Sequence, residues 1–277
     1  MRWPFVVTCA ACGRINFDPL PGPDAAPRCD PSAPFTSVTA LDELNSPVDG
    51  QGGVRLTSDE LVAMWHTTRM GSPYTLYMAM RTSRFVPFDP PFDTTIPGFF
   101  PSLSADRLTL VFDDFVDLKV ATRMIDAEPF GTSTKLPVVN TSAQEVASLL
   151  DASETLLYFT RSAATQDMFV ADWPPTMEKP IAELNSAVDY ESSPTISADG
   201  LTIYYAQRAA TATQADIWTA RRASKDVPFE QPSRVADVSS PDEDSPDWLS
   251  PDNCRLYIES RRGASVDYRL YVAERQP

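Results

Sequence analysis

The stretch PTISADGLTIYYAQR (Pro194–Arg208) is repeated in outline about fifty residues later as PDWLSPDNCRLYIESRR (Pro246–Arg262). In both stretches a short run ends in a turn with an aspartate, Asp199 or Asp252, and an aromatic-rich run follows. Two alternating apolar runs that flank a tight turn are typical of a β-hairpin. Because the same unit is written twice, the sequence predicts a repeat protein built of hairpins.

Three earlier copies precede these two: VRLTSDELVAMWHTTR (54–69), PSLSADRLTLVF (101–112) and ASLLDASETLLYFTR (147–161). The equivalent turn residues are Asp59, Asp106, Ser153, Asp199 and Asp252, at intervals of 47, 47, 46 and 53 residues. A third strand follows each hairpin, as in DIWTARR, and a fourth begins after Pro–Phe or similar punctuation, as in VPFEQPSRV. Four antiparallel strands in about 47 residues make one blade of a β-propeller. The predicted fold class is therefore an all-β propeller of five blades.

The last copy has only three strands, whereas the segment PFTSVTALDELN (34–45) ahead of the first copy has the character of a fourth strand. We therefore expect this N-terminal strand to complete the last blade and to close the ring. Closure removes the exposed sheet edges that promote aggregation. The expected domain is one closed five-bladed propeller over residues 35–277.

The matches SADGLTIYY…DIWTARR and LSPDNCRLYIESRR…LYVAER resemble the WD40-like propeller repeat of the TolB type, which occurs in bacterial envelope proteins. The resemblance extends from Phe35 to Arg275 and implies a propeller that makes protein–protein contacts near the envelope. The sequence departs from the pattern in two ways. Only the fourth copy keeps the Asp–Gly turn (Asp199–Gly200), and the second has DDFVD where others carry arginine. TolB itself has six blades, whereas five copies are found here.

The N-terminal stretch MRWPFVVTCAAC has one basic residue, a short apolar run, and two alanines ahead of Cys12. This order is typical of a lipoprotein signal peptide over residues 1–12, with Cys12 as the lipid-bearing residue. An ordinary N-terminal segment is the alternative. The proline-rich residues 13–34 are expected to form an extended linker. The predicted location is the bacterial cell envelope, after export.

Removal of residues 1–11 would leave two thiols besides Cys12, Cys29 and Cys254, and an even number in an oxidising compartment favours a disulfide. Cys254 falls at the first turn of the fifth blade, and Cys29 lies just before the fourth strand of that blade. Both positions belong to the same face of a propeller. We therefore expect a Cys29–Cys254 bond; the alternative is two unrelated cysteines.

A net charge of −15 and an isoelectric point near 4.4 argue against nucleic acid as a partner, because phosphates require a basic surface. They also argue against direct binding to an anionic membrane surface, so contact with a membrane is expected only through a lipid anchor. We expect a monomer. The partner is an unidentified protein or small ligand.

The single histidine, His66, cannot form a zinc site alone and is expected to pack within a blade or lie at the surface. Aromatic residues that recur in the second strand of each copy could form a carbohydrate platform, but their recurrence favours packing between blades. They are Trp65, Phe112, Phe159, Tyr204, Tyr205 and Tyr257.

Acidic residues precede or enter the innermost strands and are expected around one mouth of the central channel, opposite the face of Cys254. They are Glu145, Asp189, Glu191, Asp242, Glu243 and Asp244. They are candidates for binding a cation, a basic peptide or a sugar, with a merely solvated acidic rim as the favoured alternative.

The sequence therefore predicts a non-enzymatic TolB-like binding scaffold with no catalytic residues, metal ligands or cofactor. Calcium binding by the acidic rim is a weaker alternative. The alternative is a five-bladed glycoside hydrolase or carbohydrate-binding protein that uses two of these carboxylates.

Overall fold

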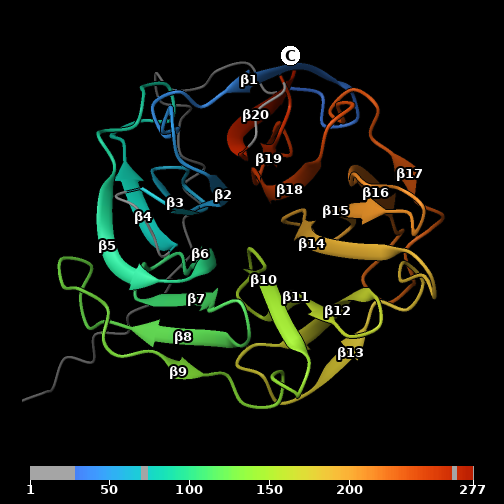
Figure 1. Ribbon diagram of the computed structural model, residues 1–277, viewed down its shortest axis with the longest axis horizontal. Helices are drawn as coiled ribbons and strands as arrows, with labels where there is room; N and C mark the ends of the chain where they lie inside the picture. The colour runs from blue at the N-terminus through green and yellow to red at the C-terminus, as the bar shows by residue number, and fades with distance from the viewer. Residues whose placement is uncertain (1–28, 70–73, 264–266, 277) are drawn as a thin grey trace, which may run out of the picture.

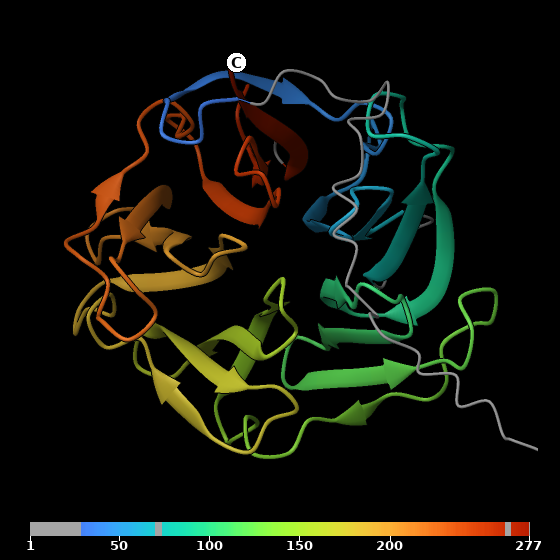
Figure 2. The same cartoon turned by 180° about the vertical axis from the view of Figure 1, so that it is seen from behind.

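The computed structural model describes residues 29–69, 74–263 and 267–276, and within them the chain forms twenty β-strands in five four-stranded sheets. Neighbouring strands of each sheet pair in antiparallel fashion. The sheets stand as blades around a central axis, with β2, β6, β10, β14 and β18 nearest that axis (Figure 1), and the same ring is seen from behind in Figure 2. The five-bladed, all-β prediction is confirmed.

Blades 1 to 5 have equivalent strands. The innermost are β2 (Gln51–Leu56), β6 (Phe99–Leu103), β10 (Gln144–Leu150), β14 (Tyr190–Ile196) and β18 (Asp244–Leu249). The second are β3 (Val62–Thr67), β7 (Thr109–Asp113), β11 (Leu156–Ser162), β15 (Thr202–Arg208) and β19 (Arg255–Ser260). The third are β4 (Thr75–Met80), β8 (Leu118–Thr122), β12 (Gln166–Asp172), β16 (Asp216–Arg221) and β20 (Arg269–Arg275). The outermost are β5 (Phe92–Pro97), β9 (Thr134–Lys135), β13 (Glu178–Pro180), β17 (Ser233–Arg234) and β1 (Phe35–Ala40).

The ring closes as expected, because β1 pairs with β20, from Phe35↔Arg275 to Ala40↔Tyr271. Figure 1 shows these two strands side by side at opposite ends of the colour range. The chain then turns at Asn45, whose side chain exchanges hydrogen bonds of 2.8 and 2.9 Å with the backbone of Leu270. Asn140 and Asn185 make the same exchange in blades 2 and 3, with Leu118 and Met168. The N-terminal segment is therefore a genuine fourth strand of blade 5.

The Pro–Phe punctuation has a structural reason. In four blades, an arginine at the end of the third strand or directly after it lies with its guanidinium over the phenylalanine of this dipeptide. The contact covers the ring where the chain turns outward. The pairs are Arg81–Phe88 (4.3 Å), Arg123–Phe130 (4.5 Å), Arg222–Phe229 (4.4 Å) and Arg275–Phe35 (4.2 Å). In the last pair the phenylalanine comes from the other end of the chain, so this contact also holds the ring closed.

The turn aspartates serve the backbone. Asp106 Oδ1 accepts a 2.6 Å hydrogen bond from Ser104 Oγ and a 2.9 Å bond from the Leu108 N–H, which hold its pKa below the usual value. Asp59, Asp199 and Asp252 make equivalent contacts with Thr57, Ser197 and Ser250. Blade 3 reverses the two positions, because there the hydroxyl of Ser153 donates to Asp151. In the four blades without an Asp–Gly turn, these side-chain hydrogen bonds hold the hairpin turn in shape without the glycine.

The hairpin turns lie on one face of the disc, here called the distal face, and the innermost strands begin on the opposite, proximal face. Cys29 and Cys254 lie on the distal face and form a disulfide that joins residues 225 positions apart, with Cα atoms 5.7 Å apart. Cys12 and the predicted signal segment lie outside the described residues, as does the linker up to residue 28.

The recurring aromatic residues of the second strands are buried, with at most 3% of any of the six exposed. They form the packing layer between blades, as expected. The described residues contain no helix that is long and apolar enough to cross a membrane.

Candidate functional site

The innermost strand of every blade carries a β-bulge at the same place. The register shifts lie at Gly52/Arg55, Phe99/Ser102, Val146/Leu149, Ser192/Thr195 and Pro246/Trp248. In four of these strands the bulge residue has a positive φ: Gly53 (66°), Phe100 (44°), Ala147 (55°) and Ser193 (52°). Bulges of this kind turn a backbone N–H away from its own ladder.

The displaced N–H groups bind a side chain of the preceding blade. The acceptor is always the fifth residue of the second strand: Phe100 N–H to His66 Nδ1 (3.4 Å), Ala147 N–H to Asp113 Oδ2 (3.0 Å), Ser193 N–H to Thr160 Oγ1 (3.1 Å) and Gly53 N–H to Glu259 Oε2 (2.9 Å). At the junction of blades 4 and 5 the equivalent residues are Ala206 and Pro246, which offer neither acceptor nor N–H. Each junction therefore has a matched pair, and four are tied by a hydrogen bond that we call the junction bond.

This pattern explains several ionisable side chains that are buried near the channel. Burial lowers the pKa of His66 to about 3, with a smaller contribution from Arg55, so its imidazole is neutral and can accept a hydrogen bond. Burial raises the pKa of Asp113 to about 8 and that of Glu259 to about 7, although both accept backbone N–H groups. His66 packs against Tyr74, Phe99 and Phe100, in agreement with the predicted packing role.

The burial of Asp113 gives a pH-dependent contribution to stability, which the junction bond to this carboxyl only partly offsets. Because the pKa of this carboxyl is about 8 in the folded chain against an ordinary 3.8, the folded state holds its proton more tightly. Stability from this group is therefore present below about pH 4 and is lost as pH rises toward 8, by at most about 1.4 kcal/mol per pH unit. Asp113→Asn should flatten the fall in urea midpoint between pH 5 and 8. Asp106→Asn, at an exposed turn with a lowered pKa, should leave this interval unchanged; equal curves for wild type and Asp113→Asn would contradict the assignment.

The centre of the channel holds a buried arginine. Arg55, on β2 of blade 1, reaches across to blade 3 and donates from Nη1 to the Ser148 carbonyl and from Nη2 to the Ala147 carbonyl, the latter at 3.4 Å. Burial lowers the pKa of Arg55 to about 10, and Asp247, Asp113 and Glu259 oppose this effect, so the guanidinium stays charged at neutral pH. Asp247 is itself fully buried. The middle of the channel is thus occupied by the protein's own ionisable side chains.

The distal mouth of the channel is small and is lined by both apolar and polar residues. Each blade contributes the last residue of its innermost strand: Leu56, Leu103, Leu150, Ile196 and Leu249. These residues enclose a cavity of about 50 Å³. Pockets that hold a ligand of drug size enclose about 300–1,000 Å³, so this mouth is too small for a sugar ring.

The six predicted acidic residues lie on the proximal face, but three of them are not part of a solvated rim. Glu145, Glu191 and Asp244 are fully buried, and each accepts the N–H of the loop that leads to its strand, from Thr141, Ser186 and Ser240. The interpretation as solvated groups is wrong for these three residues, because their position at the start of the innermost strand points inward.

Two of the buried acids are paired with arginine of their own blade. Arg161 Nε donates to Glu145 Oε1 at 2.7 Å, and Arg262 Nη2 donates to Asp244 Oδ1 at 2.8 Å. Glu191 has no such partner. The other three residues, Asp189, Asp242 and Glu243, are half-buried. Asp189 accepts the Ala210 N–H at 3.0 Å, and Glu243, which follows Asp242 in the sequence, pairs with Arg261 at 3.2 Å. No group of three or more His, Cys, Asp or Glu among the described residues is placed to hold a metal ion.

A feature that the sequence reasoning missed is an aromatic patch on the proximal face between blades 1 and 2, formed by Tyr74, Phe99, Phe100, Phe115 and Val116. The rings of Tyr74 and Phe99 are 4.7 Å apart, and those of Phe99 and Phe115 are 5.3 Å apart. Phe115 is 58% exposed and Val116 56% exposed. Phe99 and Phe100 are half-buried, so these residues make a contiguous, partly exposed apolar surface beside the channel.

The loop DDFVD holds Phe115 outward at a backbone cost. Phe115 has a φ of 69°, a region that bulky residues rarely adopt. Asp113 Oδ1 accepts its N–H at 3.1 Å, and Asp114 Oδ1 accepts the N–H groups of Val116 and Asp117. Strained residues that the surroundings fix in place are concentrated at functional sites.

The signal for this patch was present in the aligned repeats. Packing residues recur at equivalent positions, whereas the positions equivalent to Phe115 hold Thr68, Ser162, Arg208 and Arg261. The departure DDFVD in the second copy removes an arginine, and it also adds an exposed aromatic side chain, which the loss of arginine alone does not indicate. The junction bonds are harder to predict from the sequence. The aligned position of the acceptor holds five different residue types: His66, Asp113, Thr160, Ala206 and Glu259.

The geometry defines a closed five-bladed propeller with a filled channel and one specialised proximal patch. No family model and no curated protein matches the chain. Solved structures do match its fold. The putative TolB of Agrobacterium tumefaciens is similar with a TM-score of 0.51 at 14% identity, over 80% of this chain and 73% of that one.

TolB of Acinetobacter baumannii is similar with a TM-score of 0.53 at 13% identity over 82% of this chain, which spans about half (55%) of that protein. A chain of a nidogen/laminin complex gives a TM-score of 0.52 at 13% identity, over 84% of this chain and 89% of that one. The chain has a β-propeller fold like that of the TolB structures. At these identities the likeness concerns the fold.

Proposed function

We propose that this protein is a non-catalytic binding scaffold of the bacterial envelope that holds a protein partner on its proximal face. The observation that carries the proposal is the aromatic patch of Tyr74, Phe99, Phe100, Phe115 and Val116. Its most exposed members, Phe115 and Val116, lie on a strained loop that breaks the repeat. Aromatic residues are enriched at the centres of protein interfaces.

Two further observations support a scaffold. The buried ionisable residues Arg55, His66, Asp113 and Glu259 hold blades together, so their strong pKa shifts have a structural cause. The TolB-like fold and the envelope setting of TolB-type propellers support the location.

The patch is tested by capture from envelope extracts of the source cells. Phe115→Ser combined with Val116→Ser should reduce the recovery of a specific partner at least tenfold without a change in melting temperature, since both side chains are solvent-exposed. A matched control is Met124→Ser with Ile125→Ser, which removes 83% and 55% exposed apolar side chains elsewhere. Unchanged capture by the patch variant, or equal loss in the control, would rule out the patch as the binding surface.

The lipid anchor is a separate part of the proposal. It rests on the small residues Ala10 and Ala11 ahead of Cys12. Cells fed a palmitate analogue should label the wild-type chain and not Cys12→Ser, whereas equal labelling would place the lipid elsewhere, and no labelling would remove the anchor.

A further inference from the structure

Three blades contain the same arginine site on the proximal face. An arginine at the end of the second strand reaches the acid or amide that begins the innermost strand, and its guanidinium also donates to the carbonyl of a preceding loop. The contacts are Arg69 to Gln51 and the Leu44 carbonyl, Arg161 to Glu145 and the Val139 carbonyl, and Arg262 to Asp244 and the Val238 carbonyl.

Each of these guanidinium groups also lies over aromatic rings of the second or third strand. Arg69 lies 5.8 Å from Trp65 and 5.4 Å from Tyr77, and Arg161 lies 5.6 Å from Phe159 and 4.4 Å from Phe169. In blade 5, Arg262 lies 5.0 Å from Tyr271. The site therefore has three parts: an oxygen acceptor, a loop carbonyl and an aromatic wall.

Blade 4 has the three parts but lacks the arginine. Glu191 is the acceptor, the Tyr205–Trp218 pair occupies the positions of Phe159 and Phe169, and Leu184 supplies the equivalent carbonyl. The positions that carry arginine in the other blades hold Gln207 and Ala209. Glu191 Oε2 accepts the Ser186 N–H at 2.9 Å, whereas Oε1, in a side chain with no exposed surface, has no hydrogen-bond partner.

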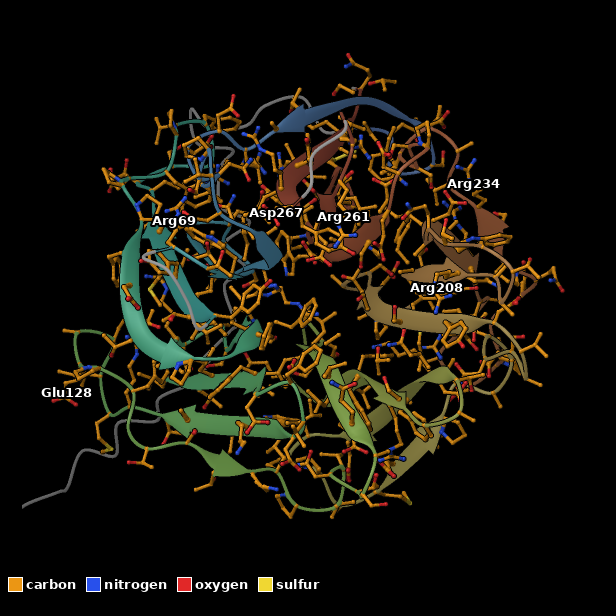
Figure 3. All side chains as sticks on the ribbon, in the orientation of Figure 1. Arg69, Glu128, Arg208, Arg234, Arg261 and Asp267 are labelled. Carbon is orange, nitrogen blue, oxygen red and sulfur yellow. A yellow bond between two sulfur atoms is a disulfide. The ribbon has the colours of Figure 1, made fainter. Side chains whose placement is uncertain are left out.

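Arg208 cannot replace the missing residue. Glu191 pairs with Gln207 in the sheet and Tyr190 pairs with Arg208, so alternation places Arg208 on the other side of the blade. Its guanidinium lies 3.9 Å from the Tyr190 ring, and Nη1 donates to the Ala212 carbonyl at 3.4 Å. Figure 3 labels Arg208 on blade 4 and Arg69, which does fill the site, on blade 1.

Blade 2 lacks both the acceptor and the arginine of this site. There the acceptor position is Gly98, and a Cβ at that residue would lie 2.6 Å from the Phe112 ring, so no acidic side chain fits. The arginine is absent as well. Blade 2 has lost both members, whereas blade 4 keeps a buried acid whose Oε1 has no partner. Burial raises the pKa of Glu191 to about 7, because no cation offsets the cost of its charge.

We propose that blade 4 is a binding site for a guanidinium group from outside the chain, an arginine side chain that is seated between Glu191 and the Tyr205–Trp218 wall. Its guanidinium takes the place that Arg161 fills in blade 3, where Nε donates to Glu145 and Nη2 donates to the Val139 carbonyl. The acceptors in blade 4 are Glu191 Oε1 and the Leu184 carbonyl. Asp189 and Asp167 add negative charge around the site. The donor is either free arginine or an arginine exposed on a basic peptide.

The proposal is tested on the folded chain by calorimetry and by NMR of the Trp218 indole signal. Nα-acetyl-arginine amide should bind with a Kd on the order of 1 mM, as expected for a ligand of this size. The citrulline analogue, which has the shape but not the charge, should bind at least tenfold more weakly. Free arginine and a capped Gly-Arg-Gly tripeptide separate the two sources, because the one that binds more tightly identifies the natural donor.

Two variants keep the test decisive. Glu191→Gln should fold with unchanged or higher melting temperature, because a neutral amide still accepts the Ser186 N–H, and should weaken arginine binding at least tenfold. Ala209→Arg, which restores the residue found in blades 1 and 5, should raise the melting temperature and abolish binding by filling the site. No binding to the wild-type chain, or equal binding by wild type and Ala209→Arg, would overturn the proposal. The Phe115/Val116 variant of the proximal patch should bind arginine normally, so the two sites are tested independently.

Discussion

Removal of the Cys29–Cys254 disulfide lowers the free energy of unfolding by an expected 2–5 kcal/mol. The bond links residues 225 positions apart, and a loop of that length restricts the unfolded chain strongly, with an upper value of about 5 kcal/mol in the chain-entropy treatment. It also ties the segment ahead of β1 to the first turn of blade 5, where the ring closes. Its loss should therefore favour separation of β1 from β20 before the other blades unfold.

The measurement is urea unfolding of Cys29→Ser/Cys254→Ser, made in a background where Cys9 and Cys12 are also serine so that no other thiol can pair. The single Cys254→Ser variant should match the double variant, since either change breaks the bond. Hydrogen exchange should show faster exchange of the Val38–Ala40 amides than of the β11–β12 ladder. An unchanged midpoint and slope would show that the closure is held by strand pairing and by the Arg275–Phe35 contact without help from the disulfide.

The fold was predictable because each blade repeats the same strand and turn pattern, and this pattern requires particular residues at fixed positions in the sequence. The turn residues Asp59, Asp106, Asp199 and Asp252 accept hydrogen bonds from a serine or threonine two residues earlier, and this fixed need preserves their spacing. The closure was predictable from the same logic, since Pro34–Phe35 copies the dipeptide that arginine covers in three other blades.

The candidate sites were only partly predictable. The sequence places Glu145, Glu191 and Asp244 together at the start of their innermost strands. It does not give the exposure of a side chain at that point, because the strand lines a channel. The pairing of Glu145 with Arg161, and of Asp244 with Arg262, depends on whether the arginine follows eight or ten residues after the turn residue. Arginines at these two spacings reach the same place in the blade but do not align with each other in the sequence. The absence of this arginine from blade 4 is therefore seen only in the structure.

The arginine sites also have a measurable structural role, which is clearest in blade 3. Arg161→Met removes the partner of Glu145 and leaves a carboxylate with no exposed surface, held only by the Thr141 N–H and hydroxyl at 3.1 and 2.6 Å. Breaking one side of a buried ion pair costs about 3–5 kcal/mol. The double variant Arg161→Met/Glu145→Gln should regain most of this loss, because a neutral amide pays no penalty for a missing charge. Thermal and urea unfolding of the wild type, the two single variants and the double variant gives the coupling energy of the pair.

Arg234→Met, which removes an exposed partner of Asp216 at 2.7 Å, is the matched surface control and should cost less than about 1 kcal/mol. Equal losses in Arg161→Met and in the double variant would mean that Arg161 acts through its bond to Glu178 Oε2 and by packing on Phe159 and Phe169. The unpaired Glu191 of blade 4 would then have no comparable requirement for a cation.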